Sequence, residues 1–283
     1  QLEENQAYSV RKYPCLDSMN EPLWPERWNY EALMQRKAEI GSLKFTREYL
    51  CIPVSTGTAL FSQDHLLNAK NEHAVLKLGH RKEKGYRYYV GVDPAISTDG
   101  DYNVIMVLEV DDNQNKTIVH VDRAKNVQFR ENIDKLRLIG QIFQPEVVLY
   151  ETNTFAKAFT QELRSVSDLN VRDFNTTRRK KQEIILNLQM NFENGKIHLP
   201  YADNNSKKMT NALIEELSMF SITESGKFEG VGAHDDLVMG LALANAASQT
   251  PTEAFMLLDD MEIFDAPQSP QIGLPQGIMG LNF

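Results

Sequence analysis

The sequence has little that would place it in a membrane or in an oxidising compartment. Its apolar runs fall well short of the roughly 20 residues that a membrane-spanning helix needs. It has two cysteines, Cys15 and Cys51, whose spacing matches no metal-binding motif. Two cysteines in 283 residues are typical of free thiols in a reducing compartment. Residues 1–11 are polar and lack the apolar centre of a secretory signal, so we expect a protein that is neither secreted nor membrane-bound.

The sequence also lacks an excess of positive charge. A net charge of -9 argues at first against a nucleic-acid partner, because contacts to phosphates use Lys and Arg. The distribution of charge matters more than its sum. The segment after Gln249 contains five acidic residues and no Lys or Arg, which leaves only -4 for residues 1–248. An acidic total is therefore compatible with a local basic surface.

Basic residues gather in two short runs. The candidate DNA-binding residues in these runs are Arg178, Arg179, Lys180, Lys181, Lys207 and Lys208. A run of like charges is as often a solvated helix face as a binding surface. The functional interpretation is a ridge that follows DNA phosphates beside an acidic site.

Alternating and continuous apolar patterns predict strands at 86–92, 102–110, 117–123, 146–150 and 171–175. Helical spacing marks 29–40, 129–143, 154–165, 178–193, 207–220 and 234–247. Three consecutive strands followed by helix, strand, helix and strand indicate a mixed α/β fold. This is the strand order of the ribonuclease-H-like fold, a mixed sheet of five or more strands flanked by helices.

The pattern divides the chain into three parts. Residues 1–65 form a lead-in or linker region with several prolines, and residues 66–248 form the organised domain. Residues 249–283 form an acidic tail, which we expect to be flexible or to dock on a partner. Within the domain, Thr223 to Gly232 is rich in glycine and predicts a mobile hairpin or loop.

Acidic residues stand at the ends of three predicted elements. Asp93 follows the first strand, Glu151 follows the fourth, and Asp235 and Asp236 begin the last helix. If the first and fourth strands are parallel neighbours, Asp93 and Glu151 emerge at the same edge of the sheet. Carboxylate oxygens suit hard cations such as Mg²⁺ and Mn²⁺, and two such ions can support cleavage of a phosphodiester. The pattern therefore predicts a metal-dependent nuclease site.

Each acid also has a structural interpretation. Asp93 before Pro94 can be a turn residue, and Glu151 can be solvated or salt-bridged. Asp235 can cap the last helix, and Asp236 can interact with the helix dipole. The three positions together favour a site more strongly than any one of them.

Two further residues are possible additions to this site. Asp101 opens the second strand and can reach the metals, and His234 can be a ligand or contact a phosphate. A structural role is as reasonable for His234.

The motifs around these acids resemble those of a known family. They are Gly91-Val92-Asp93-Pro94-Ala95, Tyr150-Glu151-Thr152-Asn153 and His234-Asp235-Asp236-Leu237-Val238-Met239. Over roughly residues 20–248 the chain resembles the C-terminal half of tailed-phage terminase large subunits. The segment Asn194-Gly195-Lys196-Ile197-His198-Leu199-Pro200 is similar to a stretch of that family.

The resemblance implies a ribonuclease-H/resolvase-like nuclease that cuts concatemeric viral DNA during packaging. It implies that Asp93 and Glu151 bind two Mg²⁺ or Mn²⁺ ions, with the third ligand on the Asp235-Asp236 pair, where we favour Asp236. Relatives often carry another acid one turn later, where this chain has Met239. Asp101 or Asp235 would then compensate.

The same resemblance implies a set of partners. Terminase large subunits carry a P-loop ATPase, but no such motif occurs here. The chain begins with Gln, and we expect a fragment that starts near the end of the motor domain. Expected partners are double-stranded DNA, the ATPase domain of the same protein, the small terminase subunit and the portal. The expected setting is the host cytoplasm, with an oligomer on the portal and a monomeric isolated fragment.

Three alternatives stay open. The first is a resolvase-like or transposase-like nuclease, against which the lead-in and tail argue mildly. The second is an actin-like nucleotide-binding fold, which needs a second Gly-rich phosphate loop. Gly226 to Gly232 supplies glycines without the strand–loop–helix context. The third is a non-enzymatic module of the packaging machine.

Overall fold

The computed structural model describes residues 11–17, 19–52, 59–77, 83–94, 102–152, 156–223, 227–230 and 235–249, with the backbone alone for 156–158. Gln1–Gln249 belongs to one compact unit, and Thr250–Phe283 is a second unit outside the described residues. The tail predicted at 249–283 falls almost wholly on that second unit. No helix in the described part of the chain is long and apolar enough to span a membrane.

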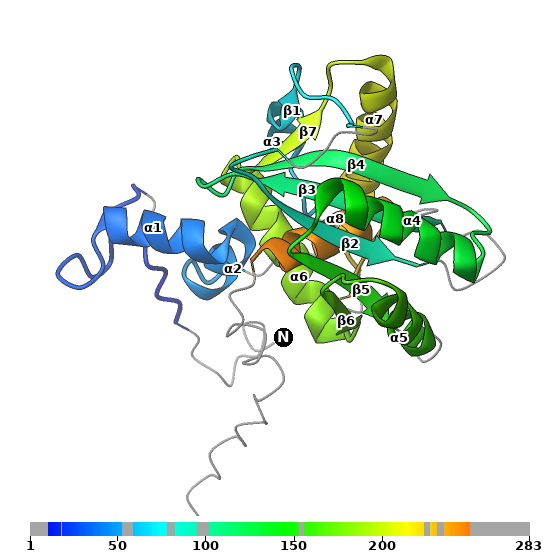
Figure 1. Ribbon diagram of the computed structural model, residues 1–283. Coiled ribbons are helices and arrows are strands. Elements are labelled where there is room, and N and C mark those ends of the chain that lie inside the picture. The colour runs from blue at the N-terminus through cyan, green and yellow to red at the C-terminus, as the bar shows by residue number, and fades with distance from the viewer. Residues whose placement is uncertain are drawn as a thin grey trace, which may run out of the picture. The chain divides into compact units, whose positions relative to one another are not determined.

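The helices and strands follow one another in a mixed order (Figure 1). The helices are α1 Tyr30–Ile40, α2 Ser42–Glu48, α3 Gln63–Asn68, α4 Phe129–Phe143, α5 Ala156–Val166, α6 Arg178–Glu193, α7 Asn204–Met219 and α8 Asp236–Ser248. The strands are β1 Lys70–Asn71, β2 Arg87–Asp93, β3 Asn103–Val110, β4 Lys116–Ala124, β5 Val147–Thr152, β6 Val171–Asn175, β7 Ile197–Pro200, β8 Phe220–Ile222 and β9 Phe228–Gly230.

Seven of the strands form one mixed sheet in the order β1-β7-β4-β3-β2-β5-β6. β2, β3 and β4 make an antiparallel meander. β5 lies parallel to β2, and β6 lies parallel to β5. On the other edge, β7 runs parallel to both β4 and β1. The predicted fold class, a mixed α/β sheet of five or more strands with flanking helices, is confirmed.

Three short elements were not predicted: α3, β1 and β7. β1 has two residues and β7 has four, so neither is long enough to show a period in the sequence. Their pairing depends on tertiary neighbours. The hairpin of β8 and β9 agrees with one of the two structures expected near Thr223, although residues 224–226 and 231–234 lie outside the described residues.

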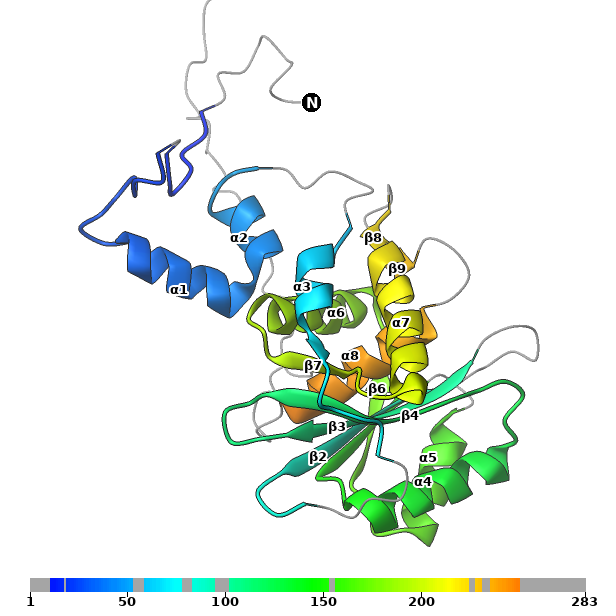
Figure 2. The same cartoon turned by 90° about the horizontal axis from the view of Figure 1, so that it is seen from above.

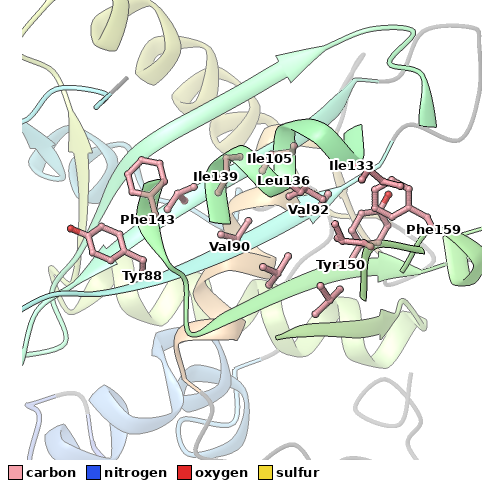
Figure 3. Packing of buried hydrophobic residues seen from close by; sticks show 14 of the residues in the cluster. Tyr88, Val90, Val92, Ile105, Ile133, Leu136, Ile139, Phe143, Tyr150 and Phe159 are labelled. Carbon is pink, nitrogen blue, oxygen red and sulfur yellow. The ribbon is translucent and has the colours of Figure 1, made fainter. Parts of the chain in front are cut away.

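One face of the sheet is covered by α4 and α5 (Figure 2). Side chains from the strands and these helices form a continuous apolar cluster (Figure 3), in which Val90, Val92 and Ile105 meet Leu136 and Phe159. Leu136 belongs to the apolar face of α4, whose buried residues recur at helical spacing. This packing fixes the direction of β2 and β5 from one side.

The opposite face of the sheet is covered by α8, with α6 and α7 behind it (Figure 2). Every residue of α8 is buried, as expected of a helix that is apolar all round. The α8 backbone approaches β2 at Gly91, where an added Cβ would lie 2.3 Å from the carbonyl oxygen of Gly240. Gly91 therefore permits the close contact that brings the start of α8 to the carboxyl end of β2.

The lead-in packs around a small apolar cluster of its own. Leu16, Leu33 and Phe45 are its buried members, and α1 and α2 supply two of them. α2 is tied to α6 by Glu193, whose carboxylate accepts hydrogen bonds from the Ser42 backbone N–H and from the Ser42 hydroxyl. The lead-in therefore rests against the end of α6.

Candidate metal centre

The carboxyl ends of β2 and β5 bring Asp93 and Glu151 together. Val92 is paired with Tyr150 in the parallel register, so the next residue on each strand is an acid. Both side chains are half-buried, and they share a hydrogen bond. The sheet edge therefore brings these two acids into contact.

The start of α8 adds Asp235 and Asp236 to the same place. Asp236 is buried, and its Oδ2 accepts a hydrogen bond of 3.3 Å from the backbone N–H of Tyr102, just before β3. Asp235 is half-buried and forms an ion pair with Lys181 of α6, whose Nζ lies 2.9 Å from Oδ2. Three segments far apart in the sequence thus converge at one end of the sheet.

These four carboxylates interact electrostatically. The pKa of Asp93 is raised well above its usual range, first because burial disfavours the charged form. The charge of Glu151 and the hydrogen bond with it raise this pKa further, and the charges of Asp236 and Asp235 add smaller increases. A negative charge on Asp93 is therefore disfavoured in this cluster while no cation is bound.

The donor set fits a hard divalent cation. Its atoms are carboxylate oxygens, which Mg²⁺ and Mn²⁺ prefer over softer ligands. Within the described ranges, however, no three His, Cys, Asp or Glu side chains already surround a point where an ion would bind. Repulsion among neighbouring carboxylates gives a physical reason for this, because it keeps acids apart until a cation is bound.

The basic run at 178–181 forms the first turn of α6. Thr177 caps this helix by accepting a hydrogen bond from the Lys180 backbone N–H at 3.2 Å. Positive side chains at a helix start oppose the helix dipole, so they weaken the helix there while creating a strongly positive site. Among them, Lys181 reaches the acids directly through Asp235.

A family model described as the terminase RNaseH-like domain matches residues 90–247. The chain belongs to this family. The match spans β2 through α8, and so includes Asp93, Glu151, Asp235 and Asp236. The match confirms the expected family and fold. A search among curated proteins found no match.

Solved structures of terminases have the same fold as this terminase domain. The large terminase nuclease of thermophilic phage G20c is 23% identical with a TM-score of 0.54, over 68% of this chain and 99% of that one. Its magnesium-bound form is 22% identical with a TM-score of 0.54, over 69% and 98%. The large terminase of bacteriophage HK97 is 11% identical with a TM-score of 0.51, over 77% of this chain and 50% of that one. At these identities the likeness shows the fold alone.

The remaining predicted residues are two lysines on α7 and two residues whose positions are not described. Lys207 and Lys208 lie in the first turns of α7, about 12 Å along that helix from Glu216, which contacts α8. Their predicted DNA contacts stay a prediction. Asp101 and His234 lie outside the described residues.

Sequence reasoning missed two charged residues beside the acids. Glu216 of α7 and Arg123 of β4 form an ion pair of 2.7 Å, and Glu216 also contacts the start of α8. One signal was available: Glu216 falls between Leu213 and Leu217 on the apolar face of α7. An acid on a buried helix face needs a partner.

Proposed function

We propose that this domain is a metal-dependent endonuclease that cuts concatemeric double-stranded viral DNA during genome packaging. The observation that carries the proposal is the convergence of Asp93, Glu151 and Asp236, which come from two parallel strands and a buried helix. The raised pKa of Asp93 agrees with this convergence, because the neighbouring acids contribute to it. Family membership supplies the terminase context. It favours this proposal over the resolvase-like, actin-like and non-enzymatic alternatives.

The three converging acids have a chemical role that follows from their charge. Asp93, Glu151 and Asp236 would hold the metal ions through their oxygens, while Asp235 faces Lys181. When bound, a pair of Mg²⁺ or Mn²⁺ ions activates water and stabilises the leaving oxygen of the phosphodiester. The magnesium-bound form of the phage G20c nuclease supports this choice of metal. Asp101 and His234 remain candidates for additional ligands.

The DNA backbone is bound by the basic turn of α6. Lys181 stands within ion-pair distance of Asp235, so a phosphate beside the acids lies within reach of this turn. Backbone contacts of this kind position DNA without reading its sequence, so we propose cutting with little sequence preference. The proposed partners are the ATPase domain of the same protein, the small terminase subunit and the portal. The proposed setting is phage assembly in the host cytoplasm.

Plasmid cleavage tests the proposal. The full 283-residue chain is incubated with supercoiled plasmid at low salt, with Mn²⁺, with Mg²⁺ or with EDTA. We expect cutting with either metal, none with EDTA, and none by Glu151→Ala. Asp134→Asn, a change of an exposed acid on α4, serves as the control and keeps full activity. An intact plasmid at high enzyme concentration with both metals would overturn the proposal.

A further inference from the structure

The start of α8 is capped in an unusual way. The first N–H groups of a helix have no partner within the helix, and an Asp at the N-cap position usually accepts one of these hydrogen bonds. Asp235 occupies that position but makes no such bond. Its carboxylate faces Lys181 instead. The N–H groups at the start of α8 must therefore be satisfied from elsewhere.

A residue of α7 supplies the cap. Oε2 of Glu216 accepts a hydrogen bond of 2.9 Å from the backbone N–H of Leu237, the second residue of α8. Oε1 of the same carboxylate accepts one of 2.7 Å from Nη2 of Arg123. Glu216 is only 8% exposed, so both bonds are shielded from water. The cap is thus a buried carboxylate contributed by another helix and held by an arginine.

Arg123 links the cap back to the acidic site. Its guanidinium lies 4.0 Å from the ring centroid of Tyr102, and the backbone N–H of Tyr102 donates to Asp236. The contacts therefore run from Glu216 through Arg123 and Tyr102 to Asp236, and return through Leu237 to Glu216. Both sides of Asp236 are fixed by the same closed network.

Burying the charged groups of this network has a desolvation cost. Burial raises the pKa of Glu216 to about 7, more than Arg123 and the α8 N–H groups lower it. Nε of Arg123 is buried and meets no hydrogen-bond partner among the described residues. Removing two charges from water often costs as much as their attraction returns, so stability alone does not explain the pair. Capping of α8 by the side chain of Asp235 would have satisfied the same N–H group without burying a second acid.

We propose that Glu216, held by Arg123, is a positioning residue of the nuclease: it caps α8 from outside and so fixes the start of α8, and with it Asp236, beside Asp93 and Glu151. Without it, the N–H groups at the start of α8 would attract nearby carboxylates, and Asp236 would turn away from the position at which it can bind a metal ion. The inference rests on the proposed metal-dependent function. It adds a residue that touches neither metal nor DNA.

Mn²⁺ binding, measured calorimetrically on the full chain, tests the inference. We expect Glu216→Ala to weaken Mn²⁺ binding by about 10-fold or more, within the range for partners of metal ligands. Plasmid cutting by this variant should recover at higher Mn²⁺ concentration. Glu216→Gln keeps an acceptor for Leu237 and is close in shape, so it should fold and show a smaller loss than Glu216→Ala.

Glu109→Gln is the matched control. Glu109 is also a buried acid, accepting hydrogen bonds from Lys77 at 2.9 Å and from the Tyr88 hydroxyl at 2.6 Å. It pairs with Tyr88, at the end of β2 away from Asp93. It should lose thermal stability while keeping wild-type Mn²⁺ affinity. If Glu216→Gln and Glu216→Ala bind Mn²⁺ as tightly as this control does, the positioning role is wrong.

The wild-type chain separates this inference from the proposed function. A wild type that binds Mn²⁺ but leaves plasmid intact overturns the nuclease and leaves the positioning of a metal ligand standing. A wild type that cuts, with Glu216 variants equal to the control, overturns the positioning alone. A wild type that binds no Mn²⁺ overturns both.

Discussion

The two ends of the β2–β3 pair each carry buried or half-buried acids, but their surroundings differ. At one end, Glu109 has Lys77 and the hydroxyl of Tyr88 as partners. Burial lowers the pKa of Lys77, but the hydrogen bonds that Lys77 donates to Glu83 and Glu109 outweigh burial and raise it. At the other end, Asp93 meets further carboxylates and its own pKa is raised. An acidic side chain is paired with a cation at one end, whereas acidic side chains are clustered with one another at the other end.

This difference separates Glu109 from Asp93, the proposed metal ligand. An acid with a cation and a hydroxyl donor stabilises the folded state, and nothing remains for it to bind. Clustered acids destabilise one another until a cation arrives, so their persistence at one sheet edge indicates a binding site. Burial or charge alone would not have distinguished Glu109 from Asp93.

The largest expected contrast comes from neutralising one acid at each end. We expect Asp93→Asn to lower plasmid cutting by more than about 100-fold while raising the thermal stability of the metal-free protein, because it removes repulsion. Glu109→Gln should do the reverse, lowering stability by about 2–3 kcal/mol and leaving cutting intact. Cleavage assays and thermal unfolding in EDTA measure both. Equal effects of the two substitutions would erase the contrast between the ends.

Stabilisation by an added metal ion should depend on the acids at the Asp93 end of the β2–β3 pair and not on Glu109. Mn²⁺ at about 100 times its dissociation constant should stabilise the wild type by about 2.7 kcal/mol, since it binds the folded state. Glu109→Gln should gain the same stabilisation from its lower starting point, and Asp93→Asn should gain little. Unfolding curves with and without Mn²⁺ measure these shifts. An Asp93→Asn variant that gains as much as the wild type would place the metal elsewhere.

The pH dependence of stability gives a smaller contrast. A carboxyl group with a raised folded pKa stabilises the fold fully below its unfolded pKa of about 4, and this contribution is lost as the pH rises through the folded pKa. The pKa of Asp93 is raised, chiefly by burial. In EDTA, the stability advantage of Asp93→Asn over the wild type should therefore grow as the pH rises from about 4. A constant difference between the two unfolding temperatures would contradict this.

The smallest expected effects concern the basic residues. Lys181→Ala should weaken DNA binding by a few-fold and reduce its salt dependence, because one phosphate contact is lost. Lys208→Ala is the matched comparison, since Lys208 lies at the end of α7 away from the acids. Binding of a DNA duplex at several salt concentrations measures both. A larger loss of DNA affinity for Lys208→Ala than for Lys181→Ala would indicate that DNA binds near Lys208 instead.

Much of the fold could be read from the sequence because its central elements carry strong patterns. β2 and β5 are apolar runs that end in an acid, and α8 is rich in Ala and Leu. The parallel contact of β2 with β5 was an assumption in the sequence analysis, and the strand register shows it. β1 and β7 could not be found, because two and four residues are too few to show a period.

The candidate site was predictable where acids end elements, and not where partners come from distant segments. Glu216 and Arg123 are separated by 93 positions, and the sequence around neither residue predicts their contact. The missing cap at Asp235 was equally invisible, since its residue type predicts that it caps α8. Tertiary neighbours override such local preferences. Lys181 and Lys208 stand in similar basic runs, and their different distances from the acids follow from the directions of α6 and α7.

The most direct test of the metal site is a crystal structure of the full chain soaked with Mn²⁺, with the ions located by their anomalous scattering. We expect Mn²⁺ between the carboxyl ends of β2 and β5 and the start of α8, bound by Asp93, Glu151 and Asp236. Glu216 should still cap Leu237 in that structure. Mn²⁺ bound at other residues, with no ion at Asp93, Glu151 and Asp236, would contradict the proposed metal site.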